Sequence, residues 1–314
     1  DEQRVLTASS DGTARVWDLT TGEAQVLEGH QNLVRSAVFS QDEQRVLTAS
    51  DDGTARVWDL TTGEAQVLEG HQNWVLSAVF SQDEQRVLTA SSDGTARVWD
   101  LTTGEAQVLE GHQNWVLSAV FSQDERRVLT ASSDGTARVW DLTTGEAQVL
   151  EGHQNLVLSA VFSQDEQRVL TASSDGTARV WDLQGRELNI FDDHTGAVID
   201  ARFSTNGQQI LTASADGTAR VWHADTLKPL LIRACNHMNI YLVNNPDVLK
   251  DLTVCHTPQR LSAASRMLVQ TGDRLARRDN PDAAVENYQL ANIWSPGLVP
   301  NPVQRANDLL DADR

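Results

Sequence analysis

Residues 70–100 read GHQNWVLSAVFSQDEQRVLTASSDGTARVWD, and almost the same text recurs along most of the chain. One tryptophan in each copy marks the period. These tryptophans stand 41 residues apart, at Trp17, Trp58, Trp99, Trp140, Trp181 and Trp222; the first five precede an aspartate and the sixth precedes His223. A fixed period of this length predicts an array of repeated structural units.

Each unit contains four short segments with the composition of β-strands. In the copy above, side chains alternate over residues 75–80, residues 86–91 and 95–99 are rich in β-branched residues, and 107–110 forms a fourth segment. Turn-forming residues separate them: Ser81-Gln82-Asp83-Glu84, Ser92-Asp93-Gly94 and Thr102-Thr103-Gly104. The unit is therefore predicted to be an antiparallel sheet with strands a to d in chain order. One such sheet cannot bury both of its faces, so it must stack on its neighbours.

The recurring Gly-His, Ser-Asp-Gly-Thr and Val-Trp-Asp motifs resemble the WD-repeat family of β-propellers, and the period fits four strands per blade. The resemblance covers residues 1–232. It implies an all-β propeller of about six four-stranded antiparallel blades, followed by a small α-helical region. The chain enters at a second strand, so the first blade is expected to be incomplete. The strand that closes the ring is expected either to lie before Asp1 or to come from the tail, where residues 239–243 are one candidate.

The resemblance also implies a hydrogen-bonded set of histidine, serine or threonine, aspartate and tryptophan in each blade. Carried onto this sequence, the sets are His30, Ser50, Asp52, Trp58; His71, Ser91, Asp93, Trp99; His112, Ser132, Asp134, Trp140; His153, Ser173, Asp175, Trp181; and His194, Ser214, Asp216, Trp222. The first blade keeps Ser9, Asp11 and Trp17 without a histidine. The hydroxyl is left open, because the threonine two residues before each serine points to the same strand face.

Histidine, serine and aspartate are also the residues of a hydrolase triad. Five identical copies argue against catalysis, because a buried indole N–H and a buried imidazole need such partners for structural reasons. Metal binding by these histidines is disfavoured, because ligands must converge and these lie in separate blades. We therefore expect no catalytic residue, no cofactor and no metal site.

Four near-identical copies (residues 1–41, 42–82, 83–123 and 124–164) differ at only four positions. Three of these positions fall where the d–a loop enters strand a or in the b–c turn, which share the top rim of a propeller. They are Leu33, Trp74, Trp115, Leu156; Arg35, Leu76, Leu117, Leu158; and Ser10, Asp51, Ser92, Ser133. In WD-repeat proteins this rim is the usual partner-binding surface, and Trp, Leu and Arg suit a binding hot spot. The alternative is that these side chains pack between blades as core.

Composition separates a propeller from a tail. All seven prolines follow residue 224, and residues 224–314 carry ten acidic and ten basic residues, so the chain's net charge of −19 belongs to the repeats. This charge disfavours nucleic-acid and anionic-membrane partners. Two cysteines form no disulfide framework, and no signal peptide or membrane span is visible. We expect a cytoplasmic protein. Because the sequence starts at Asp1 and in phase with the repeat, we expect further domains upstream.

The tail, expected over residues 233–314, shows helical signals. Residues 229–232 are expected to complete the sixth blade, and 265–298 resemble one tetratricopeptide unit with helices at 261–278 and 282–294. The small, aromatic and proline positions of that unit are Gly272, Ala284, Tyr288, Ala291 and Pro296. Cys235, His237, Cys255 and His256 lack zinc-ligand spacing, and the two cysteines are expected to be buried thiols. The tail also resembles the helical ends of large bacterial WD-repeat signalling proteins.

Three classes of function are compatible with a chain of this kind. A protein-interaction scaffold or sensor needs only a ring and a variable rim, and both are predicted here. An enzyme needs different groups converging on one point, which near-identical blades supply poorly. Nucleic-acid binding is opposed by the acidic charge. The sequence therefore favours a non-catalytic recognition module, and the repeated rim suggests a protein or peptide ligand with repeated contacts.

Overall fold

The computed structural model describes residues 3–224, 239–251, 258–278 and 280–312. The chain divides into two compact units, Asp1–Ala224 and Asp225–Arg314. The boundary expected after residue 232 stays a prediction, because residues 225–238 lie outside the described part. The expected strand at 229–232 and the cysteines and histidines at 235, 237, 255 and 256 lie there or in the gap at 252–257.

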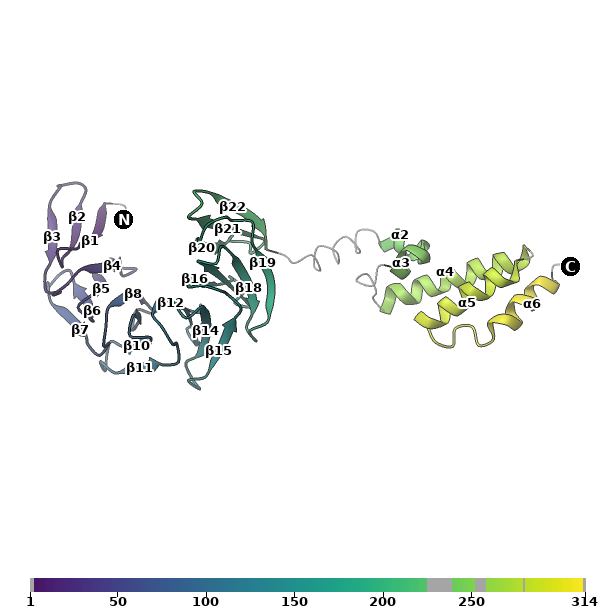
Figure 1. Ribbon diagram of the computed structural model, residues 1–314, viewed down its shortest axis with the longest axis horizontal. Coiled ribbons are helices and arrows are strands. Elements are labelled where there is room, and N and C mark those ends of the chain that lie inside the picture. Colours follow the sequence, from purple (N-terminus) through teal and green to yellow (C-terminus); the bar gives the residue numbers. More distant parts are fainter. Residues whose placement is uncertain (1–2, 225–238, 252–257, 279, 313–314) are drawn as a thin grey trace. The chain divides into compact units, whose positions relative to one another are not determined.

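The first unit consists of six antiparallel sheets, the blades (Figure 1). Blade one contains β1 (Arg4–Ala8), β2 (Ala14–Asp18) and β3 (Ala24–Leu27); blade two contains β4 (Val34–Phe39), β5 (Arg45–Ser50), β6 (Ala55–Asp59) and β7 (Ala65–Leu68). Blade three contains β8 (Val75–Phe80), β9 (Arg86–Ser91), β10 (Ala96–Asp100) and β11 (Ala106–Leu109); blade four contains β12 (Val116–Phe121), β13 (Arg127–Ser132), β14 (Thr136–Asp141) and β15 (Ala147–Glu151). Blade five contains β16 (Val157–Phe162), β17 (Arg168–Ser173), β18 (Ala178–Asp182) and β19 (Glu187–Phe191); blade six contains β20 (Val198–Phe203), β21 (Gln209–Ser214) and β22 (Ala219–His223).

The predicted propeller fold is confirmed, including the incomplete first blade. Blade one has three strands because the chain enters at its second strand. Within each blade the strands pair in chain order, as the short turns between them dictate. Blade six also shows three strands among the described residues.

The core lies between blades, as the stacking argument requires. The β5 side chains Leu47 and Ala49 pack against Val87 and Trp99 of blade three. The neighbouring residue Val46 faces the other way and packs against blade one. Because side chains alternate along a strand, each blade contributes one face to each of two junctions.

The blades follow one another along an open arc in Figure 1, and the first and last sheets do not pack together. The outward face of blade six leaves Leu211 and Val221 exposed by 50% and 64%, and Val5 in blade one is exposed by 42%. Leu47 and Val46, at equivalent repeat positions to Leu211 and Val5, are both 0% exposed. The same residues are therefore core or surface according to whether a neighbouring blade covers them.

The second unit is helical. It contains α2 (Asn239–Asn244), α3 (Pro246–Asp251), α4 (Pro258–Arg277), α5 (Pro281–Trp294) and α6 (Pro302–Ala312). The suggestion that residues 239–243 form a strand is wrong, because they form α2. Gly272 of α4 lies against the ring of Tyr288 of α5, where a Cβ would come within 2.5 Å of the ring. Close packing at this point explains the small residue, and Ala284 and Ala291 are also fully buried.

Candidate protein-binding surface

A hydrogen-bonded network joins strands and loops within each inner blade. In blade two, the indole N–H of Trp58 donates to Thr48 Oγ1 at 2.9 Å. The ring of His30 bonds through Nε2 to Thr48 Oγ1 at 2.7 Å and through Nδ1 to Asp52 Oδ2 at 2.8 Å. An ionised carboxylate can only accept, so Nδ1 carries the proton and Nε2 accepts from the threonine hydroxyl. The hydroxyl that contacts both the histidine and the tryptophan therefore belongs to the threonine and not to the serine.

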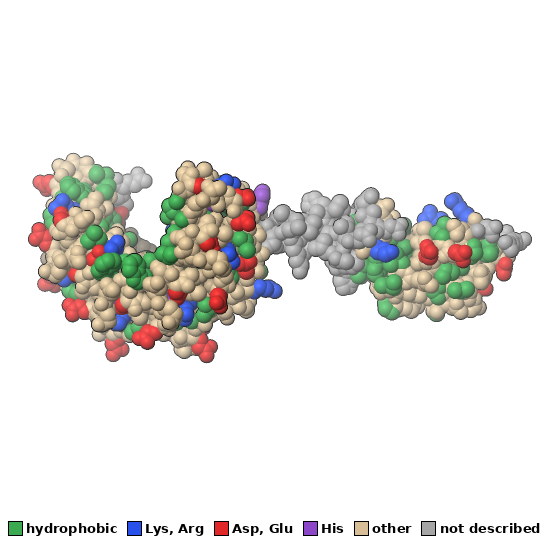
Figure 2. All heavy atoms as spheres, viewed as in Figure 1, with side chains coloured by type: hydrophobic (Ala, Val, Ile, Leu, Met, Phe, Trp, Pro, Cys, Tyr) green, Lys and Arg blue, Asp and Glu red, His purple; other side chains and the backbone are tan. Residues whose placement is uncertain are grey.

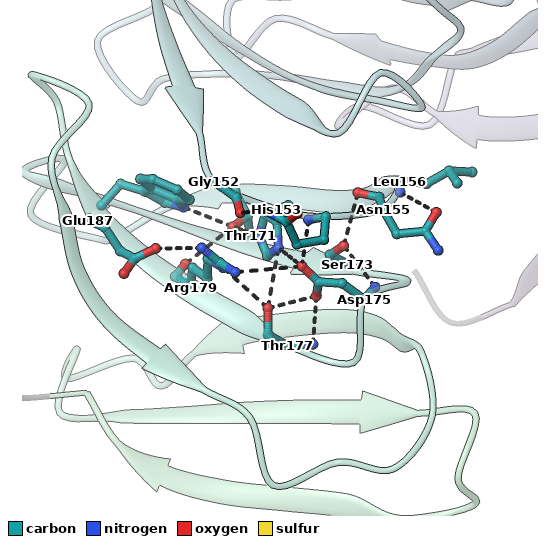
Figure 3. Close-up of polar contacts among 12 residues, drawn as sticks. Gly152, His153, Asn155, Leu156, Thr171, Ser173, Asp175, Thr177, Arg179 and Glu187 are labelled. Carbon is teal, nitrogen blue, oxygen red and sulfur yellow. Dashed lines mark hydrogen bonds and ion pairs between the residues drawn. The ribbon is translucent and has the colours of Figure 1, made fainter.

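The serine has a different place in the network. Ser50 Oγ accepts from the backbone N–H of Asp52 at 3.1 Å and donates to the carbonyl of Asn32 at 3.2 Å. It therefore ties the b–c turn to the d–a loop. Figure 3 shows the same arrangement in blade five. The central hydroxyl in the other sets that contain a histidine belongs to Thr89, Thr130, Thr171 and Thr212. In blade one, Trp17 donates to Thr7 and the described residues supply no histidine.

Burial and hydrogen bonding set the protonation states of these groups. Burial lowers the pKa of His30, His112 and His153, and the pairing with aspartate only partly opposes it. Burial alone would raise the pKa of Asp52, but bonds from Gln31, Thr54 and His30 outweigh it and lower the pKa to about 2. The sets of His30, His112 and His153 thus hold a neutral imidazole beside an ionised carboxylate at neutral pH.

The distance between the Thr48 hydroxyl and the His30 ring would suit a nucleophile and its general base. The position of this hydroxyl in the protein excludes that role. Thr48 is 0% exposed, so a substrate has no access to it. Its lone pairs also accept the indole N–H. The network is therefore built to hold strand b, strand c and the d–a loop together.

The variable positions lie side by side at the top of each blade. The backbone N–H of Asp51 in the b–c turn donates to the carbonyl of Leu33 in the d–a loop at 2.9 Å. The same bond joins Ser92 to Trp74 and Ser133 to Trp115. Two loops that are separate in the sequence therefore present one surface, which we call the top rim.

The third variable position is a β-bulge. The register of strand a on strand b shifts between Val34 and Ser36, so Arg35 is the extra residue. Leu76, Leu117, Leu158 and Ile199 fall at the same irregularity in later blades. A bulge re-aims a side chain relative to the regular pleat. Nothing in the residue pattern signalled this bulge, and the sequence analysis missed it.

Two tryptophans form the apolar part of the rim. Trp74 and Trp115 belong to adjacent blades, their ring centroids lie 5.9 Å apart, and they remain 38% and 44% exposed. The guanidinium of Arg35 lies over Trp74 at 5.3 Å and forms an ion pair with Asp51. The leucines at the other variable rim positions are partly buried: Leu33, Leu76, Leu117, Leu156 and Leu158. The rim residues thus touch across blade junctions while still offering surface to a partner.

A second repeated contact, at the a–b turn, was not foreseen. Glu84 has a positive φ of 55°, which is uncommon for a residue other than glycine. Its carboxylate bonds to the Arg45 guanidinium at 2.7 Å and to the backbone N–H of Gln41, both in the preceding blade. Glu43, Glu125 and Glu166 make the equivalent ion pairs with Arg4, Arg86 and Arg127. The sequence marked this segment only as a turn.

Comparison with known families identifies the repeat. The model of the WD domain, G-beta repeat, matches residues 1–18, 22–59, 63–100, 104–141, 145–182 and 185–223. The chain belongs to the WD40 repeat family. A comparison with curated proteins gave no match. WD40 repeats generally mediate protein–protein interaction, and the family is typically a non-enzymatic scaffold.

The described residues contain no group of three histidine, cysteine, aspartate or glutamate side chains able to hold a metal ion. No helix in the described ranges is long and apolar enough to span a membrane. Acidic side chains are scattered over the outer edge of the WD40 unit in Figure 2.

Proposed function

We propose that this chain is a non-catalytic recognition module that binds a protein or peptide partner on the top rim of its propeller. The observation that carries the proposal is the pair Trp74 and Trp115, which stays about two-fifths exposed at a junction of adjacent blades. Exposed aromatic residues held by their neighbours are typical anchors of protein interfaces.

Sequence variation and geometry support the same surface. Arg35, Asp51 and the bulge residues change between copies that are otherwise almost identical, and Arg35 joins Asp51 to the face of Trp74. Their variation alters the rim and leaves the buried networks unchanged. We further propose that the partner makes repeated contacts and that the module serves a larger cytoplasmic signalling protein. Weak contacts on several rims would add through effective concentration.

The test compares partner capture by the wild type with capture by the triple variant Trp74→Ala, Trp115→Ala and Leu117→Ala. Thermal unfolding of both is recorded in parallel. We expect the variant to lose the captured protein while keeping its unfolding temperature within a few degrees. The matched control is Leu19→Ala with Ile293→Ala, two side chains that are 61% and 71% exposed and are not among the rim residues.

Two results would contradict the proposal. Capture that survives the triple substitution in a folded variant would exclude the rim as the binding surface. Equal loss of capture in the control would show that nonspecific apolar contact explains the binding.

A further inference from the structure

Each blade carries an arginine on strand c, two residues before the tryptophan that recurs every 41 residues. In the inner blades its guanidinium lies over that indole: the distance to the ring centroid is 5.8 Å for Arg56, 5.7 Å for Arg97 and 5.7 Å for Arg138. The guanidinium also lies against the glycine of the d–a loop. At Gly70, a Cβ would come within 2.5 Å of Arg97 Nη1. Stacking on one side and backbone on the other hold the side chain in place.

The blades that have diverged in sequence supply this arginine with a carboxylate. In blade five, Arg179 Nη1 lies 2.6 Å from Glu187 Oε2, and Arg179 Nε donates to Thr177 (Figure 3). In blade six, Arg220 lies 4.0 Å from Asp193, which replaces the loop glycine. Two different substitutions thus bring an acid to the same guanidinium.

The three most similar blades have no such acid. Register places Ala65 opposite Trp58, as Glu187 is placed opposite Trp181. Among the described residues, the side chains of Arg56, Arg97 and Arg138 have no carboxylate partner, and the buried Nε of each has no acceptor. The buried Nε of Arg220 in blade six also has no acceptor, so Asp193 does not reach this atom. A buried N–H without an acceptor is costly, and an aromatic face does not replace a hydrogen-bond acceptor.

We propose that Arg56, Arg97 and Arg138 form a row of three oxyanion sites that take carboxylate side chains of an acidic segment of the partner. The planar guanidinium fork matches a carboxylate, and blade five shows such a pair formed within the chain. This inference rests on the proposed function in one respect: it assumes that the ligand is a protein.

The row and the rim share the same loops. Gly70 touches Arg97, and Trp74 follows four residues later in the same d–a loop. A partner segment lying along the loop reaches both. The repeats carry the chain's net charge of −19, which repels anions at long range. The arginine contacts must therefore outweigh this repulsion, and the apolar anchors add to the affinity of an acidic partner segment.

The probe is a hexaglutamate peptide added to the full chain with ¹⁵N-labelled arginine, and hexaglutamine is the uncharged control peptide. We expect the Nε–H signals of Arg56, Arg97 and Arg138 to shift, and that of Arg186, which is 77% exposed and paired with Asp182, to stay. Arg97→Gln is expected to weaken binding about tenfold, as for the loss of a charged hydrogen bond.

A second variant fills one site from within. Ala106→Glu places an acid opposite Trp99 in blade three, and we expect it to abolish the Arg97 shift while Ala106→Gln leaves it in place. Equal shifts at Arg186, or binding unchanged by Arg97→Gln, would overturn the inference. Shifts caused by inorganic phosphate with none from hexaglutamate would overturn the carboxylate assignment in favour of a phosphorylated partner.

The outcome is separable from that of the proposed function. If the protein captured through Trp74 and Trp115 is retained equally by the Arg56→Gln, Arg97→Gln and Arg138→Gln triple variant, the oxyanion row is wrong and the rim proposal stands. If the peptide titration succeeds while the rim variants still capture protein, the row stands and the apolar anchor is wrong.

Discussion

Blade three and the two end blades contain almost the same amino acids in different surroundings. Leu88 in blade three is 1% exposed, and Leu211, at the same repeat position in blade six, is 50% exposed. Thr89 is 0% exposed, whereas Thr7 of blade one is exposed. The sequence pattern within one unit predicts a strand and its two faces, but the next blade determines whether a face becomes core.

The largest difference should appear on truncating the leucine at the blade junction. Leu88→Ala removes a fully buried side chain between blades three and four and is expected to cost about 2–5 kcal/mol. Leu211→Ala should cost less than about 1 kcal/mol, since half of that side chain is already in solvent. Denaturant unfolding followed by tryptophan fluorescence measures both. Equal costs would mean that the end face of blade six is covered in solution.

The central hydroxyl gives the next largest effect. Thr89→Val keeps the shape of the side chain but leaves the indole N–H of Trp99 and the Nε2 atom of His71 without their hydrogen-bond partner. We expect a loss of about 2–4 kcal/mol, because two buried polar groups lose their bond. Thr7→Val in blade one is the matched control and should cost less than about 1 kcal/mol, because Thr7 is solvent-exposed. A small effect of Thr89→Val would show that the network contributes little to stability.

Acid should destabilise the inner blades progressively. The folded pKa of His30, His112 and His153 lies below the unfolded value of 6.5, so the unfolded chain binds more protons as pH falls below about 7. Asp52, Asp134 and Asp175, with folded pKa values of about 2 against 3.8, extend the loss to lower pH. Unfolding free energy should therefore decrease continuously from neutral pH downward. A flat profile between pH 7 and 5 would contradict the neutral, buried state of the histidines.

The smallest effect is expected at the a–b turn. Glu125→Gly relieves a positive φ of 54° but removes the ion pair to Arg86. These terms oppose each other, so the net change should stay within about 1 kcal/mol. Blade six has Gly207 at this place with a φ of 65°, and Arg168 bonds its carbonyl instead. Comparing the free energy of unfolding of Glu125→Gly with that of Glu125→Gln separates the relief of backbone strain from the loss of charge. A larger decrease in this free energy for the glycine variant than for the glutamine variant would show that the relief of strain is negligible.

The period of the tryptophans, the turn residues and the strand composition were enough to predict the propeller, its incomplete first blade and the helices that follow. These features depend on local chemistry and on one distance repeated along the chain. The residues that form the hydrogen-bonded sets were also predictable, except for the choice between serine and threonine. That choice depends on which hydroxyl faces the indole across two strands.

Other features exist only once blades are placed against each other. The bulge at Arg35 realigns strand a on strand b. The contact between Trp74 and Trp115 and the ion pair between Glu84 and Arg45 each join residues about one repeat apart. The same is true of Arg97, which is half-buried and lacks the carboxylate partner that Glu187 gives to Arg179. The sequence by itself determined the unit and its repetition, because short-range propensity and periodicity are local properties. Tertiary structure alone decided exposure and pairing, because these depend on the neighbour that each blade meets.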